Sequence, residues 1–193
     1  LQPSTIRWSA DHETLLGLVR LNDSIERTIA VRISLDGTVK QLVEGDALRA
    51  VADFSDGTVV TATESNVTIG QAAPVTIAVS SISASPDGTS VAVFGDDGVQ
   101  VLKASGAPVK ADESVTSAGS WAADSSVLAY FRITGDNASV WLTELDGTPV
   151  LVADKAGFVA PQLSADGDFV VYNEAVDSGE GFAEPHARAR ALS

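Results

Sequence analysis

At 193 residues and 45% hydrophobic composition, the chain is long enough to bury a core, which argues against intrinsic disorder. Its 26 acidic and 12 basic side chains give a formal charge of −14, which repels nucleic-acid phosphates and anionic lipids, and no apolar run is long enough to insert in a membrane. Cysteine is absent, so disulfides, thiolate metal sites and cysteine nucleophiles are excluded.

A short turn pattern recurs along the chain. It consists of an apolar or aromatic residue, Ser or Ala, one variable residue and Asp, often followed by Gly. It occurs at Trp8–His12, in a shorter form at Phe54–Gly57, and again at Ala84–Gly88, Trp121–Ser125 and Leu163–Gly167. The Asp residues at 11, 56, 87, 124 and 166 are 45, 31, 37 and 42 residues apart, close to the roughly 40 to 50 residues of a four-stranded propeller blade. The spacing predicts four full units and a remnant.

Each turn is followed by a β-branched or aromatic run that predicts a strand. These runs are Thr14–Val19, Thr58–Thr63, Ser90–Phe94, Val127–Arg132 and Phe169–Tyr172. A second hairpin signal follows at Leu35–Gly37, Ser105–Gly106 and Leu145–Gly147, flanked by alternating strands such as Thr28–Ser34 and Ser139–Thr143. Asp-Gly favours hairpins because Gly accepts positive φ and Asp bonds its own backbone two residues on. One unit therefore holds four strands.

The predicted fold is all-β, a propeller of four-stranded antiparallel blades in a single domain or fragment. The expected blades are 4–45, 46–80, 81–115, 116–156 and 157–193, with the last incomplete. In that last unit we expect two clear strands, a polar loop over Asp177–Gly181, and at best one weak outer strand in Ala183–Ser193. Almost no helix is expected, because apolar residues never keep helical spacing beyond a turn or two. A β-sandwich is the alternative, but the same turn at the same place in every unit favours a propeller.

The turns Trp8–Asp11 and Ser85–Gly88, and apolar strands such as Val91–Phe94 and Leu128–Phe131, resemble TolB-like and WD-repeat-like β-propeller repeats. The resemblance covers nearly the whole chain. It implies a ring of blades in a secreted or periplasmic protein, used as a protein-binding platform or as the accessory domain of a serine peptidase. It implies no particular ligand.

Acidic residues occupy the loops that blade topology gathers on one face. Within blades they are Asp23, Glu26, Glu64, Asp96, Asp97, Asp136, Asp177 and Glu180; between blades they are Glu44, Asp46, Asp112, Glu113 and Asp154. Such a face predicts binding of a basic protein or peptide, or of hard cations such as calcium. A solvated rim that serves solubility is the alternative. No EF-hand spacing is present, so neither a metal nor a cofactor is predicted.

No catalytic residue is predicted. His12 and His186 read as exposed turn residues, no serine lies in a Gly-x-Ser-x-Gly elbow, and the recurring Asp residues read as turn caps rather than paired acid and base. Trp8 and Trp121, at equivalent places before the turn, are expected to pack between adjacent blades.

Two functions remain open. The first is a non-catalytic binding or scaffold propeller of a secreted or cell-envelope protein that contacts a protein or peptide through the loop face. The second is the accessory propeller of a larger hydrolase, such as a serine peptidase, whose catalytic domain lies outside this chain. Methionine is absent, so we expect an excised or processed part of a longer protein, with an oligomer or a further segment completing the ring. A composition rich in Ala, Val, Asp and Gly is typical of a secreted bacterial protein.

Overall fold

The computed structural model describes residues 6–20, 27–105, 107–135, 137–145, 147–156, 160–177 and 183–192. Every regular element in these residues is a β-strand, and they contain no helix able to cross a membrane. The strands form five antiparallel sheets, numbered here sheet 1 to sheet 5 in chain order. The first four have four strands and the last has three. The prediction of an all-β chain of four-stranded units is confirmed.

Each sheet is a meander of consecutive strands. Sheet 1 contains β1 (Arg7–Trp8), β2 (Thr14–Arg20), β3 (Arg27–Ser34) and β4 (Val39–Asp46). Sheet 2 contains β5 (Ala50–Asp53), β6 (Val59–Ala62), β7 (Asn66–Ile69) and β8 (Val75–Thr76). Sheet 3 contains β9 (Ser81–Ala84), β10 (Ser90–Gly95), β11 (Gly98–Lys103) and β12 (Val109–Asp112). Sheet 4 contains β13 (Gly119–Trp121), β14 (Val127–Thr134), β15 (Asn137–Glu144) and β16 (Val150–Ala156). Sheet 5 contains β17 (Gln162–Leu163), β18 (Phe169–Asp177) and β19 (Ala183–Ala191).

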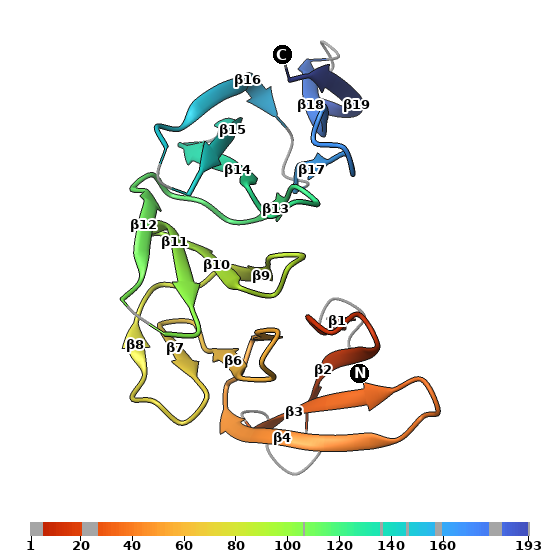
Figure 1. Ribbon diagram of the computed structural model, residues 1–193. Coiled ribbons are helices and arrows are strands. Elements are labelled where there is room, and N and C mark those ends of the chain that lie inside the picture. Colours follow the sequence, from red (N-terminus) through yellow and green to blue (C-terminus); the bar gives the residue numbers. More distant parts are fainter. Residues whose placement is uncertain are drawn as a thin grey trace.

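The five sheets follow one another around an arc, with sheets 1 and 5 at its two ends (Figure 1). The first strand of a sheet lies on the inner side of the arc, as β1, β9, β13 and β17 show, and β4, β8, β12 and β16 lie on the outer side. Neighbouring sheets touch through β2 and β5, β5 and β9, β9 and β13, and β13 and β17. This radial arrangement is that of propeller blades.

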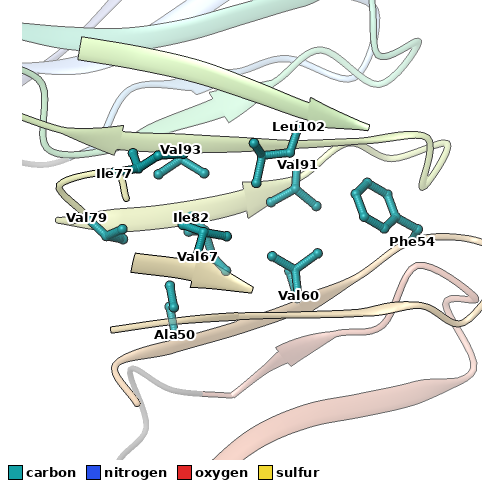
Figure 2. Close-up of a cluster of buried hydrophobic side chains, with 12 residues drawn as sticks. Ala50, Phe54, Val60, Val67, Ile77, Val79, Ile82, Val91, Val93 and Leu102 are labelled. Carbon is teal, nitrogen blue, oxygen red and sulfur yellow. The ribbon is translucent and has the colours of Figure 1, made fainter. Parts of the chain in front are cut away.

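Buried strands alternate their side chains between the two neighbouring sheets. In β10, Val91 and Val93 pack against sheet 2, whereas Ala92 and Phe94 pack against sheet 4. Figure 2 shows the first of these interfaces, where Val91 points toward Val60 of sheet 2 and Val93 lies beside Ile77 in the same cluster. Burying each such side chain contributes roughly 1.5 to 3 kcal/mol. Because both faces of β10 are covered, its sequence reads as an unbroken apolar run rather than an alternating one.

The recurring Asp residues cap the hairpin turns. In each, Oδ1 accepts the backbone N–H two residues further on, at 2.8 to 3.1 Å, as seen at Asp11, Asp36, Asp56, Asp87, Asp124 and Asp166. In the turn at Phe54–Gly57, Gly57 has φ of +83°, which a residue with a Cβ adopts only with strain. The interpretation of these Asp residues as turn caps is confirmed.

Sheet 5 differs from the expectation. The strand predicted at Phe169–Tyr172 is longer in the structure, because β18 continues to Asp177, the first residue of the predicted polar loop; the rest of that loop lies outside the described residues. The weak outer strand predicted near the end is instead β19, a nine-residue strand that pairs with β18 along its whole length. Hydrogen bonds in a ladder come from the backbone, so a segment with few apolar residues still forms a strand where a partner strand is present.

Candidate functional site

Three predicted site residues lie on loops that meet at one end of the strands of sheets 2 and 3. The connection between these sheets holds the loops together: Val79 donates its N–H to the carbonyl of Glu64 at 2.8 Å, and Ala78 donates its N–H to Oδ2 of Asp97 at 3.2 Å. The β6–β7 turn and the β10–β11 turn are therefore neighbours. The structure brings together Glu64, Asp96 and Asp97.

Glu113 joins this group from the next connection, since the backbone at Gly98 packs directly against Asp112 and Glu113. We call Glu64, Asp96, Asp97 and Glu113 the acidic loop patch. All four are exposed. Two cations lie beside them: Arg49 pairs with Glu64 at 2.8 Å, and Lys110 pairs with Glu113 at 3.5 Å. Four carboxylates against two cations leave the patch negative, which attracts cationic groups.

The β10–β11 turn is fixed by close packing. The hydroxyl of Thr116 donates to the carbonyl of Gly98 at 3.0 Å, and its backbone N–H donates to the carbonyl of Gly95 at 3.0 Å. A Cβ on Gly95 would lie 1.9 Å from the carbonyl oxygen of Ala78. The carboxylates of Asp96 and Asp97 are thus displayed from a turn with little freedom to move.

The other predicted site residues are not placed with the patch. Asp23, Glu26, Asp136 and Glu180 lie outside the described residues. Asp177 is the last residue of β18, and its side chain is outside the described part of the chain. Their assignment to the acidic face stays a prediction.

Asp112, expected on the acidic face, is instead a buried link between sheets 3 and 4. It is 7% exposed and accepts hydrogen bonds from the Tyr130 hydroxyl, from Arg132 Nε at 2.6 Å and from the Ser114 N–H at 2.9 Å. Burial, the largest influence, raises the pKa of Asp112, but these donors together outweigh it and hold that pKa below its ordinary value. Burial and the adjacent carboxylate raise the pKa of Tyr130. Asp112 therefore stabilises the fold.

Asp53 makes the corresponding link between sheets 1 and 2. Its buried carboxylate accepts from the Ser9 hydroxyl, from the Ala10 N–H at 2.8 Å and from Arg32. Sequence reasoning missed this residue. The sequence shows only an Asp at the end of a short apolar strand, and this pattern does not reveal which groups donate hydrogen bonds to it.

The turn carboxylates are held ionised by their own turns. A hydrogen bond from the Thr58 N–H lowers the pKa of Asp56, and bonds from Ser126 do the same for Asp124. An acid catalyst needs a raised pKa, so this environment suits capping rather than proton transfer.

His12 links two turns: its Nε2 lies 2.9 Å from the carbonyl oxygen of Pro86 in sheet 3. The side chain of His186 lies outside the described part of the chain. Among the described residues, no three or more His, Asp or Glu side chains gather in a way that could hold a metal ion.

The tryptophans do not share one environment. Trp121 is 7% exposed and donates its indole N–H to the carbonyl of Ser83 in sheet 3 at 3.0 Å, as expected for a residue packed between blades. Trp8 is 55% exposed, so the described residues do not bury it between two blades. Trp141 lies within β15, with the Arg132 guanidinium 3.4 Å from its ring centroid.

Two hollows in the described part of the chain lie between the outer parts of neighbouring sheets, away from the acidic loop patch. One hollow, of about 440 Å³, lies between sheets 4 and 5. Its lining is mainly apolar and also includes the charged residues Glu144 and Arg190. A second, of about 470 Å³, lies between sheets 3 and 4. Neither contains a histidine.

The fold is shared with proteins of known structure. The chain is similar to TolB from Acinetobacter baumannii, with 16% identity, a TM-score of 0.63, and coverage of 97% of this chain and 51% of TolB. It is similar to hydrazine synthase from Kuenenia stuttgartiensis, with 16% identity, a TM-score of 0.68, and coverage of 98% and 62%. It is also similar to the tricorn protease, with 15% identity, a TM-score of 0.63, and coverage of 90% and 19%.

No family model and no curated protein matches the sequence. The chain spans about half of the TolB chain and somewhat less than two thirds of the hydrazine synthase chain. Both the strand arrangement and these similarities lead to one conclusion: the chain has the fold of a TolB-like β-propeller.

Proposed function

We propose that the chain is a non-catalytic binding or scaffold propeller that contacts a basic protein or peptide through the acidic loop patch. The observation that carries this proposal is that exposed carboxylates from three neighbouring loops converge: Glu64 from one, Asp96 and Asp97 from the second, and Glu113 from the third. We place the protein in a secreted, periplasmic or cell-envelope setting, supported by the resemblance of its turns to TolB-like repeats and by its fold.

The spread of the patch favours a macromolecular partner over a metal ion. A calcium site draws six to eight oxygens onto one point, whereas these carboxylates sit on separate turns. Arg49 and Lys110 already neutralise part of the charge. A partner with several spaced cations gains most from such a surface, mainly in association rate and specificity.

The test compares two variants that lose equal charge from opposite ends of the strands. The patch variant is Glu64→Gln, Asp96→Asn and Glu113→Gln; Asp97 is kept because it accepts the N–H of Ala78. The control variant is Glu13→Gln, Glu144→Gln and Asp168→Asn, on the turns of the other face. A fluorescent peptide alternating Lys and Ser is titrated into each, and anisotropy gives the Kd.

The patch variant should bind about tenfold more weakly than the wild type, and the control variant should change far less. Raising the salt concentration should weaken wild-type binding and shrink the difference between variants. Equal losses in the two variants would mean that only net charge matters, and the proposal would be wrong.

A second candidate is an accessory propeller of a larger hydrolase. Its support is the similarity to the tricorn protease, where a region like this chain occupies 19% of a longer enzyme chain. The same peptide assay separates the two, because an accessory role does not require the acidic loop patch to bind a basic peptide.

A further inference from the structure

Trp8 and Trp121 occupy the same place in their sheets. Each lies in the inner strand and pairs with a leucine of the second strand, Trp8 with Leu15 and Trp121 with Leu128. Their surroundings differ. Trp121 is 7% exposed and Leu128 is fully buried, whereas Trp8 is 55% exposed and Leu15 is half-buried.

The buried pair shows what this position does between blades. Trp121 and Leu128 pack against Ala92 and Phe94 of sheet 3. The indole of Trp121 also donates to the carbonyl of Ser83, in the inner strand of that sheet. One side chain therefore supplies both apolar contact and a directed hydrogen bond to the preceding blade.

Sheet 1 presents the same features on a face that no described residue covers in this way. Its other face is occupied, since Leu16 and Ala30 pack with Val51 of sheet 2. Side chains alternate along a strand, so Leu15 lies on the opposite face from Leu16, together with Trp8. Figure 1 places sheet 1 at the end of the arc. We call Ile6, Trp8 and Leu15 the open face of sheet 1.

We propose that the open face of sheet 1 docks a further propeller blade from outside residues 1–193. The occupant is a four-stranded antiparallel sheet whose inner strand offers a backbone carbonyl to the Trp8 indole, as Ser83 does for Trp121. The interface between sheets 3 and 4 is its template, because the open face continues the same repeat. The similar proteins have longer chains, since this chain spans 51% of TolB and 62% of hydrazine synthase, so their length allows a further blade.

The blade also has a shape requirement. Ile6 lies two residues before Trp8, and Gly119 lies two residues before Trp121, so the two positions are equivalent. A Cβ on Gly119 would lie 2.4 Å from the backbone oxygen of Ala129 in its own sheet and 2.7 Å from the Phe94 ring of sheet 3. A blade that fits sheet 1 therefore carries a residue smaller than Phe at that position.

The competing occupant is the outward face of sheet 5, from the same chain or from a second copy. Phe169 and Val171 are 45% and 44% exposed there, on the opposite side of β18 from the buried Val170. Sheets 1 and 5 are the end sheets of the arc (Figure 1), so a second copy docked on sheet 1 would bring four further sheets to this end, whereas a single blade repeats only the contact seen between sheets 3 and 4.

The first measurement is the exposure of Trp8 in the chain as it stands. The protein is labelled with 5-fluorotryptophan, Trp8→Phe assigns the ¹⁹F signal, and a soluble paramagnetic agent reports exposure. Native mass spectrometry gives the oligomeric state. We expect a monomer with Trp8 far more broadened than Trp121. A Trp8 signal as protected as that of Trp121, released by Val171→Lys, would assign the open face to sheet 5 and overturn the proposal.

The second measurement supplies a blade. A second copy of residues 77–118 is fused ahead of Ile6, with Phe94→Ala in the added copy to leave room for Ile6. Trp8 should become as protected as Trp121, and the urea midpoint should rise. Trp8→Ala should remove that rise in the extended chain while changing the original chain little.

A parallel fusion keeps Phe94 and carries Ile6→Gly, which repeats the contact between sheets 3 and 4. This version guards against failure of the first fusion to fold. If Trp8 remains exposed in both, the open face does not accept a blade and the proposal is wrong.

Discussion

Arg132 donates its Nε–H to Oδ2 of Asp112 at 2.6 Å, joining sheet 4 to sheet 3. The Asp112 side chain is 4% exposed and that of Arg132 is 21% exposed. The same guanidinium stacks on Trp141. The pair is therefore shielded from water and braced by an aromatic ring, which makes it a strong link between blades rather than a weak surface pair.

Replacing Asp112 should destabilise the protein strongly. Asp112→Ala leaves the Arg132 cation and the Tyr130 hydroxyl without their acceptor, and the expected loss in free energy of unfolding is about 3 kcal/mol. Urea unfolding measures it. The matched control is Glu113→Ala, one residue along, whose side chain is 85% exposed and should cost less than about 0.5 kcal/mol. Similar losses in the two variants would contradict the structural role of Asp112.

Removing the Tyr130 hydroxyl should raise the pKa of Asp112, because that hydroxyl is among the donors that lower it. A carboxyl with a folded pKa below its ordinary 3.8 adds stability above that value and loses it as pH falls through the folded pKa. In Tyr130→Phe the contribution of Asp112 to stability should therefore be smaller, and its loss should be complete at a higher pH. Carboxyl ¹³C titration and acid unfolding measure both effects.

Tyr172→Phe is the control for that experiment, since Tyr172 packs at the other side of sheet 4 and makes no contact with Asp112. It should leave the pKa of Asp112 unchanged. An unchanged pKa in Tyr130→Phe as well would show that the hydroxyl does not serve Asp112.

Gly95→Ala should displace the turn that carries Asp96 and Asp97. The new Cβ would meet the carbonyl of Ala78, and we expect a loss of about 3 kcal/mol together with weaker binding of the basic peptide. Gly37→Ala is the control: its φ of +87° is unfavourable for Ala, but the space is open, so the cost should be about 1 kcal/mol with binding unaffected. Thermal unfolding and anisotropy give the two readouts. Equal stability losses would show that the turn yields easily.

Turns and strands could be predicted from the sequence because their causes are local. Asp124 caps its own turn by accepting the backbone N–H two residues further on. The apolar run Val91–Phe94 predicts a strand regardless of which sheets pack against it. The meeting of Glu64 with Asp97 was likewise predictable in outline, since blade topology puts those turns on one face.

Contacts between sheets could not be predicted in this way. Nothing near Asp112 in the sequence indicates that Tyr130 and Arg132 bury it. Trp8 and Trp121 have nearly the same local sequence, and their exposures differ because, among the described residues, a neighbouring sheet packs against Trp121 but not against Trp8. The strand β19 was underestimated because its stability comes from pairing with β18.

Binding of a basic partner at the acidic loop patch can be located by following amide shifts in ¹H–¹⁵N spectra during titration with the Lys-Ser peptide. If the patch binds the peptide, shifts are expected at residues 64–65, 77–79, 95–98 and 113, with little change at the opposite turns, residues 10–13, 86–88 and 165–168. Shifts centred on the opposite turns, or spread evenly over all acidic residues, would contradict binding at the acidic loop patch.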